Sequence, residues 1–180
     1  GRTDRTVSVV VPTIDRYPYL EPLLHQLAAQ TVAPHEVLVV DQTPIGHRRH
    51  DLTSVEPDLP VTVIELPAPG QCTARNAALQ EATGELVLFI DDDDEISPTL
   101  LEDHLGLLVD GIDASCGGVD DATAGPPPEG FRHRRASDVF PTNNTMLRRS
   151  ALERSGLFDL AFDRDARHGD FAGARQRVAA

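Results

Sequence analysis

The sequence contains no lysine, so all sixteen of its basic residues are arginines. The absence of lysine excludes Schiff-base chemistry and the lysine of a phosphate-binding P-loop. The sequence also lacks a Gly-x-Gly-x-x-Gly fingerprint, which argues against a dinucleotide-binding Rossmann domain. Any nucleotide bound by this chain must therefore be held by other groups.

Cysteine is scarce and long apolar runs are missing. Cys72 and Cys116 are too few for a disulfide framework, and neither belongs to a Cys-x-x-Cys pair. No apolar run is long enough to span a bilayer, and no signal peptide is recognisable. We therefore expect no transmembrane segment in this chain and a location in the reducing cytoplasm.

Acidic residues outnumber basic ones by 29 to 16, which gives a formal net charge of -13. A charge of this sign argues against nucleic acid or an anionic membrane surface as the main partner. The 180 residues, 40% of them hydrophobic, are enough for one domain with a sizeable core.

One acidic stretch organises the chain. Residues 86–90 form a continuous apolar run, typical of a strand buried on both faces, and four aspartates follow it directly, Asp91 to Asp94. Adjacent carboxylates repel one another, so this placement favours a divalent-metal site that holds a phosphorylated ligand. The alternative is a solvated acidic turn before a helix that begins at Pro98, although such a turn does not need a buried strand in front of it.

The rest of the pattern alternates between strands and helices. Apolar runs at 7–11 and 36–40 read as buried strands, 61–66 as a third strand, and segments 20–30, 73–82 and 98–108 as helices. Strands that alternate with helices indicate an α/β domain with a mostly parallel central sheet flanked by helices. The second strand delivers Asp41 at its carboxyl end, the edge at which open sheets of this kind bind ligands. Residues 112–116 predict a further short strand, and 117–138 a loop.

Five segments, in order, resemble the family-2 glycosyltransferases of the GT-A fold. They are Ser8-Val9-Val10-Val11-Pro12-Thr13, Val39-Val40-Asp41, Pro69-Gly70 through Ala74-Arg75-Asn76, Phe89-Ile90 with Asp91–Asp94 and Pro98, and Asn144-Thr145-Met146 through Gly156-Leu157-Phe158-Asp159. The resemblance spans nearly the whole chain. It implies a single Rossmann-like GT-A domain over 1–180, with a nucleotide-sugar-binding half at 1–97 and an acceptor-side half at 98–180.

The resemblance also implies a function and a set of site residues. The family is inverting and transfers a sugar from a nucleoside-diphosphate sugar, here expected to be a UDP-sugar, to an acceptor such as a saccharide, a lipid-linked glycan or a natural product. Its Asp-x-Asp motif predicts Asp93 as direct ligand of Mg²⁺ or Mn²⁺, with Asp91 as second ligand or support. The expected donor-binding residues are Pro12, Thr13, Arg16, Asp41, Arg75 and Asp92. Asp41 is expected on the base, Asp92 on the ribose and Arg16 near the diphosphate, and Arg75 either near the diphosphate or supporting Asp41.

Asp170 is the expected general base, with His168 as the alternative. The chain departs from the family pattern here, because His168-Gly169 precedes a single acid, and after Asp41, where Gln42-Thr43-Pro44 follows. Simpler interpretations stay open: Asp41 as a helix cap or turn residue, Arg75 as a surface arginine, and Asp170 as an acid at the start of a helix. We expect Asp94 and Glu95 to be solvated. A non-catalytic nucleotide-sugar-binding module of the same fold is the main functional alternative. A nucleotidyltransferase is disfavoured, because it needs a glycine-rich first loop and lysines.

Overall fold

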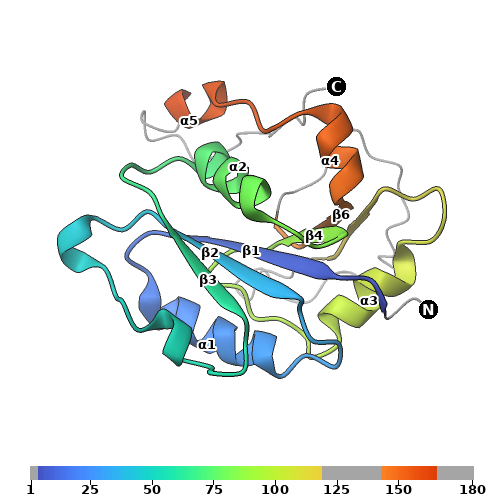
Figure 1. The fold of residues 1–180 in the computed structure, drawn as a ribbon, viewed down its shortest axis with the longest axis horizontal. Coiled ribbons are helices and arrows are strands. Elements are labelled where there is room, and N and C mark those ends of the chain that lie inside the picture. The colour runs from blue at the N-terminus through green and yellow to red at the C-terminus, as the bar shows by residue number, and fades with distance from the viewer. Residues whose placement is uncertain (1–3, 119–142, 166–180) are drawn as a thin grey trace, which may run out of the picture.

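The computed structural model describes residues 4–118 and 143–165, which form a layered α/β structure (Figure 1). In this part of the chain a six-stranded sheet has the strand order β3-β2-β1-β4-β6-β5. The pairs β1–β2, β2–β3 and β1–β4 are parallel, whereas β6 runs antiparallel to both β4 and β5. The strands are β1 (Val7–Thr13), β2 (Glu36–Asp41), β3 (Val61–Glu65), β4 (Leu86–Phe89), β5 (Ala114–Cys116) and β6 (Thr145–Arg148).

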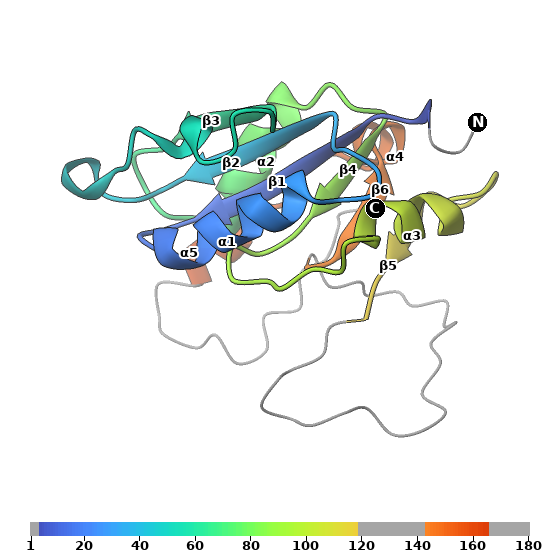
Figure 2. The same cartoon turned by 90° about the horizontal axis from the view of Figure 1, so that it is seen from below.

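Helices cover both faces of the sheet. In Figure 1, α1 and α3 lie below it, and α2, α4 and α5 lie above it; Figure 2 shows α1 and α3 from below. Two short 3-10 turns, η2 (Ile45–His47) and η3 (Leu52–Ser54), interrupt the segment between β2 and β3. The helices are α1 (Tyr17–Ala28), α2 (Gln71–Glu81), α3 (Leu100–Leu107), α4 (Arg149–Ser155) and α5 (Ala161–Asp165).

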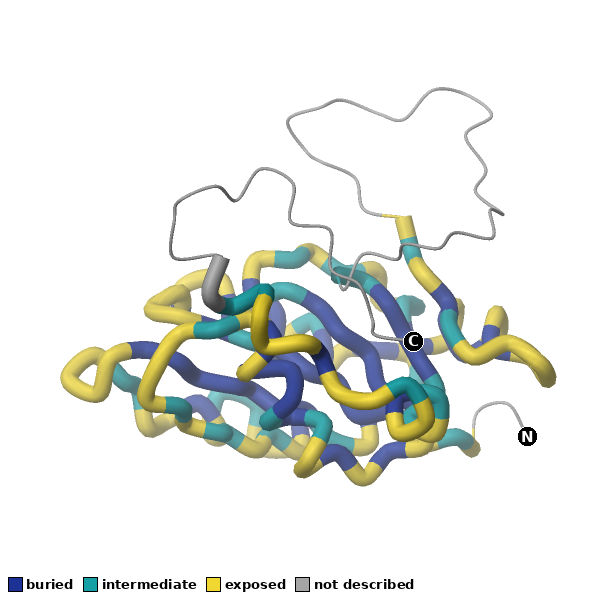
Figure 3. The backbone as a smooth tube through the Cα atoms, turned by 90° about the horizontal axis from the view of Figure 1, so that it is seen from above, coloured by how far each residue is buried: buried dark blue, intermediate teal, exposed yellow. Residues whose placement is uncertain are grey.

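Strand alternation divides the core into two layers. Val9 and Val11 of β1 pack with the leucines of α1 and α3, and Val10 packs on the opposite face with α2 and Leu152 of α4. β1 and β4 are buried along nearly their whole length, so side chains on both of their faces must be covered by helices. Figure 3 shows these buried stretches in the middle of the tube, with the exposed stretches in the outer loops.

The structure confirms the predicted fold class and the four apolar strands. The expected strand at 112–116 is present as β5, whereas β6 was not predicted as a strand. The boundary between a nucleotide-sugar-binding half (1–97) and an acceptor-side half (98–180) stays a prediction. Most of the expected loop at 117–138 lies outside the described residues. Within the described ranges, no helix combines the length and the apolar character needed to cross a bilayer.

Candidate functional site

A cavity of about 190 Å³ opens at the carboxyl ends of β1 and β4, beside the first turns of α2. The strand ends deliver polar side chains there because β1 and β4 run parallel. Seven of the nine predicted site residues line this cavity: Pro12, Thr13, Arg16, Arg75, Asp91, Asp92 and Asp93. Asp41 is held beside it, and Asp170, with its alternative His168, lies outside the described residues.

The four aspartates form a tight turn, hereafter the acidic loop (Asp91–Asp94). The backbone N–H of Asp94 donates to the carbonyl of Asp91 at 3.2 Å, and Asp94 Oδ2 accepts from the backbone N–H of Asp91 at 2.9 Å. Asn143 Nδ2, from the residues before β6, donates to Asp94 Oδ1 at 3.3 Å. The prediction that Asp94 is merely solvated is therefore wrong, since its carboxylate closes the loop; Glu95 is exposed, as expected.

Asp92 points inward and Asp93 outward. Asp92 is buried, accepts a hydrogen bond from Thr13 Oγ1 at 2.8 Å and lies 3.5 Å from Arg16 Nε. Asp93 is exposed and accepts a hydrogen bond from Arg16 Nη2. One guanidinium therefore bridges two neighbouring carboxylates at the cavity wall.

Arg75 comes from the second turn of α2 and approaches the acidic loop from the other side. Its side chain is 5% exposed, and its Nη2 lies 4.0 Å from Asp91 Oδ1. The guanidinium also lies 5.9 Å from the ring centre of Phe158. Arg75 is therefore not a surface arginine, and its burial beside Asp91 makes it part of the cavity wall.

Burial dominates the electrostatics of this site. It raises the pKa of Asp91, Asp92 and Asp94, and repulsion among the neighbouring carboxylates raises it further. Contacts with Arg75 lower the pKa of Asp91, and Thr13 and Arg16 act in the same direction on Asp92. A cation near the loop would relieve this repulsion.

Asp41 ends β2 and is fully buried, with 0% exposure. Tyr17 Oη donates to its Oδ2 at 2.6 Å, and the backbone N–H of Thr43 donates to its Oδ1 at 2.9 Å. Asp41 would make these two contacts even if its only role were structural, in the turn that follows β2. A contact between Asp41 and a nucleotide base stays a prediction, and because the carboxylate is fully buried it requires neighbouring residues to move.

The cavity is also lined by three residues that were not predicted as site residues, Ile14, Gln42 and Gln71. Gln42 Nε2 donates to the carbonyls of Ala68 and Gly70 at 2.9 and 3.1 Å, and so anchors the loop that leads into α2. The position of Gln42 directly after Asp41, at the carboxyl end of a strand, was the available sequence signal.

The carboxylates fit a divalent metal only in part. Over residues 4–118 and 143–165, no group of three or more His, Cys, Asp or Glu side chains is gathered as metal ligands. Mg²⁺ sites, however, commonly use one or two carboxylates together with substrate phosphates. Asp91 and Asp93 on the cavity wall fit that kind of site, in which a diphosphate supplies the remaining oxygens.

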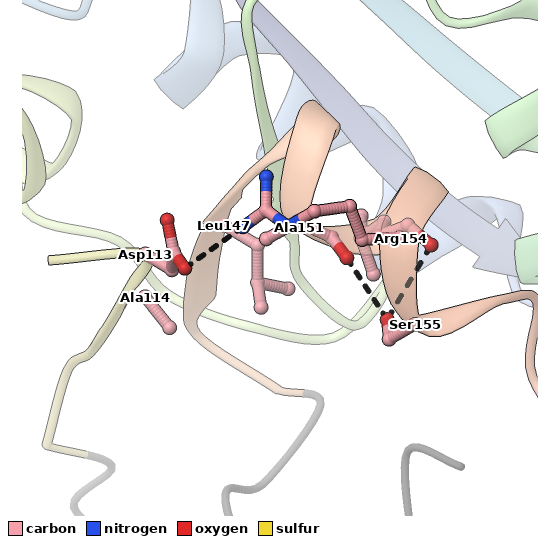
Figure 4. A pocket seen from close by; sticks show the side chains of 7 residues that line it. Asp113, Ala114, Leu147, Ala151, Arg154 and Ser155 are labelled. Atoms are coloured by element: carbon pink, nitrogen blue, oxygen red, sulfur yellow. Dashed lines mark hydrogen bonds and ion pairs between the residues drawn. The ribbon is translucent and has the colours of Figure 1, made fainter. Parts of the chain in front are cut away.

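A larger hollow of about 440 Å³ lies between β5, β6 and α4 (Figure 4), and no residue of the acidic loop lines it. Its polar groups satisfy one another: Arg154 Nη2 pairs with Asp113 Oδ2 at 3.0 Å, and Ser155 Oγ donates to carbonyls of its own helix. Its wall is otherwise apolar, so it offers fewer polar groups for binding or catalysis than the cavity at the acidic loop does.

A family model described as glycosyl transferase family 2 matches residues 8–178. The glycosyltransferase YwdF of Bacillus subtilis is 35% identical over 97 residues, covering 53% of this chain and 35% of that protein. The glycosyltransferase alr2836 of Nostoc is 30% identical over 170 residues, covering 82% and 52%. The chain thus spans about half or less of the length of these relatives.

Solved structures of glycosyltransferases also match this chain over most of its length. A fragment of Staphylococcus aureus TarS in complex with UDP matches with a TM-score of 0.66 at 27% identity, over 88% of this chain and 51% of that one. The mannosyltransferase PcManGT of Pyrobaculum calidifontis, in complex with GDP-mannose and Mn²⁺, matches with a TM-score of 0.65 at 25% identity, over 87% and 48%.

Proposed function

Because this chain belongs to glycosyl transferase family 2 and has the GT-A fold, we propose that it is a metal-dependent, inverting glycosyltransferase. It moves a sugar from a nucleoside-diphosphate sugar to an acceptor hydroxyl. The observation that carries the proposal is the cavity that gathers Asp91, Asp93, Arg16 and Arg75 at the carboxyl ends of parallel strands. The nucleotides bound to TarS and PcManGT support a nucleotide-sugar donor, and we favour a UDP-sugar.

In this proposal Asp93 and Asp91 would hold Mg²⁺ or Mn²⁺ together with the donor diphosphate. The metal would stabilise the charge that develops on the leaving diphosphate. Arg75 and Arg16 supply further positive charge, Asp92 contacts the ribose, Asp41 the base, and Pro12 and Thr13 form the adjoining wall. The reaction is proposed to run in the cytoplasm, on a saccharide, lipid-linked glycan or natural-product acceptor.

Asp170 is proposed to take the acceptor proton. The acceptor oxygen then forms a bond to the anomeric carbon from the side opposite the leaving group, and the bond to the diphosphate oxygen breaks. The anomeric configuration inverts, and the proton ends on the Asp170 carboxylate.

The proposal is tested by measuring sugar release from UDP-sugars and from GDP-mannose, with a panel of acceptors, in Mn²⁺ and in EDTA. We expect turnover in Mn²⁺, its loss in EDTA and its loss in Asp93→Ala. Asp170→Asn should bind donor and Mn²⁺ nearly as the wild type does and lose about 10²- to 10⁴-fold in turnover.

The outcomes separate the alternatives. Wild-type protein that binds a nucleotide sugar but neither transfers nor hydrolyses it is a binding module. An unchanged rate for Asp170→Asn moves the role of base to His168, and equal activity in EDTA removes the metal from the mechanism.

A further inference from the structure

Arg16 lies at the end of the loop that joins β1 to α1, with its guanidinium against the acidic loop. Nη2 donates to Asp93 Oδ2, and Nε lies 3.5 Å from Asp92 Oδ1. The side chains of Arg16 and Asp93 are 44% and 43% exposed, so both ends of this contact can move, whereas Asp92 is buried against Thr13. The guanidinium also lies 5.1 Å from the ring centre of Tyr19.

We propose that Arg16 is a tethered counter-cation that a divalent metal replaces. Without ligands its guanidinium neutralises Asp93, the expected metal ligand. When metal and nucleoside diphosphate bind, Arg16 releases Asp93 and pairs with the diphosphate. This inference rests on the proposed metal-dependent function and adds to it a competition between a residue of the chain and the metal.

The competition follows from charge. The guanidinium of Arg16 is hydrogen-bonded to Asp93 Oδ2, and a divalent cation held by the same carboxylate would repel that guanidinium at short range. The diphosphate gives the released guanidinium a new partner, because arginine pairs with phosphate oxygens through two parallel hydrogen bonds. Metal alone must therefore displace Arg16 from Asp93 without supplying a replacement anion.

Coupling between the two ligands is the expected consequence. The nucleotide should strengthen metal binding by more than direct metal–phosphate contact provides, since it also receives Arg16. By linkage, the metal strengthens nucleotide binding by the same factor.

Titration of the 180-residue protein with Mn²⁺ alone, and with Mn²⁺ at saturating UDP, tests this, with free Mn²⁺ followed by its electron paramagnetic resonance signal. Arg16→Ala should bind Mn²⁺ alone about two- to fivefold more tightly, because an exposed ion pair no longer competes. The factor by which UDP strengthens Mn²⁺ binding should fall by roughly tenfold, because a charged contact to the diphosphate is lost.

Arg154→Ala is the matched control, because it also removes one exposed, ion-paired arginine, but away from the acidic loop. We expect both Mn²⁺ titrations of this variant to equal those of the wild type. An equal tightening in Arg154→Ala would mean that net charge alone acts, and it would overturn the proposal.

Arg16→Gln is the second variant, and its Mn²⁺ titrations should change as those of Arg16→Ala do. Both variants should fold, because the Arg16 side chain makes no capping hydrogen bond to α1. Unchanged or weaker binding of Mn²⁺ alone in both would show that Arg16 does not compete with the metal. If the wild type binds neither Mn²⁺ nor UDP, the proposed function fails instead, so the two failures are distinct.

Discussion

At the scale of single residues, Asp41 shows how a buried carboxylate is kept in place. Its two oxygens accept hydrogen bonds from Tyr17 Oη and from the Thr43 backbone, and the backbone N–H of Arg49 donates to the same Tyr17 oxygen at 3.3 Å. This chain of contacts joins α1, β2 and the segment after η2. Tyr17 therefore supports Asp41 whether or not Asp41 contacts a nucleotide.

Tyr17→Phe should lower the free energy of unfolding by about 1.5–3 kcal/mol, because a fully buried carboxylate loses a charged hydrogen bond. Urea unfolding followed by circular dichroism measures this. Tyr19→Phe, at an exposed ring, is the control and should lie within about 0.5 kcal/mol of the wild type. Equal stability of Tyr17→Phe and the wild type would contradict this role of Tyr17.

The proposed contact between Asp41 and the nucleotide base is tested by measuring nucleotide affinity. Asp41→Asn preserves the shape of the side chain better than alanine does at this buried site. If Asp41 reads the base, Asp41→Asn should bind UDP more weakly, and calorimetry measures the difference. UDP affinity equal to that of the wild type would leave Asp41 as a turn residue only.

At the scale of elements, a side chain from α5 holds the N-terminus of α2. Asp163 Oδ1 accepts from the backbone N–H of Cys72 at 2.7 Å, and its Oδ2 accepts from the backbone N–H and the hydroxyl of Thr73 at 2.8 and 2.7 Å. These are N–H groups without partners inside the helix, and the carboxylate also interacts favourably with the helix dipole. α2 carries Gln71 and Arg75, so this contact helps to set the cavity wall.

A double-mutant cycle tests the contact between Asp163 and α2. Asp163→Ala should cost about 0.5–2 kcal/mol of stability, as the loss of a helix cap does. Gly70→Ala should also destabilise the protein, because a Cβ at Gly70 would lie 2.7 Å from Asp163 Oδ2. The glycine substitution should cost less in the Asp163→Ala background, since the crowding carboxylate is gone.

Gly46→Ala is the control for the cycle, because a Cβ at Gly46 meets nothing within 4 Å. We expect it to leave stability nearly unchanged in thermal unfolding. If the costs of Gly70→Ala and Asp163→Ala simply add, the two positions do not interact as described.

At the scale of the whole molecule, a buried histidine links three elements around the antiparallel edge of the sheet. His104 of α3 contacts Ser115 Oγ of β5 through Nδ1 at 2.7 Å and Asn144 Oδ1, before β6, through Nε2 at 2.9 Å. Burial lowers the pKa of His104, against the opposing effects of Asn144 and Asp103. The folded protein therefore favours neutral His104.

Stability should consequently fall as the pH drops below about 6.5, where the unfolded chain binds a proton that folded His104 resists. The contribution is fully present above that pH and is lost toward the lower pKa of the folded state. For one proton the slope is at most about 1.4 kcal/mol per pH unit. Urea unfolding between pH 5 and 8 measures it.

His104→Gln should remove this contribution to the pH dependence of the free energy of unfolding. His50→Gln, at an exposed position, should keep it. The same pH dependence in the wild type and in His104→Gln would assign the effect to other groups.

The sequence was enough to identify the parallel strands and the acidic loop. Residues 86–90 are apolar throughout and run straight into Asp91, and this local pattern predicts both a doubly covered strand and carboxylates at its end. Five of the seven predicted residues that line the cavity, Pro12, Thr13 and Asp91 to Asp93, meet there for the same reason, because the parallel strands β1 and β4 present their carboxyl ends at one edge. Patterns of this kind depend on short-range periodicity, which a single sequence displays.

Contacts between distant segments could not be predicted in this way. β6 is only four residues long, and its place between β4 and β5 depends on pairing with strands far away in the chain. Arg16 reaches Asp93 across 77 positions and Asp163 reaches Thr73 across 90. No local propensity encodes which carboxylate a given donor meets. That choice follows from how the helices pack on the two faces of the sheet, so the burial of Asp41 and of Arg75 became visible only in the folded molecule.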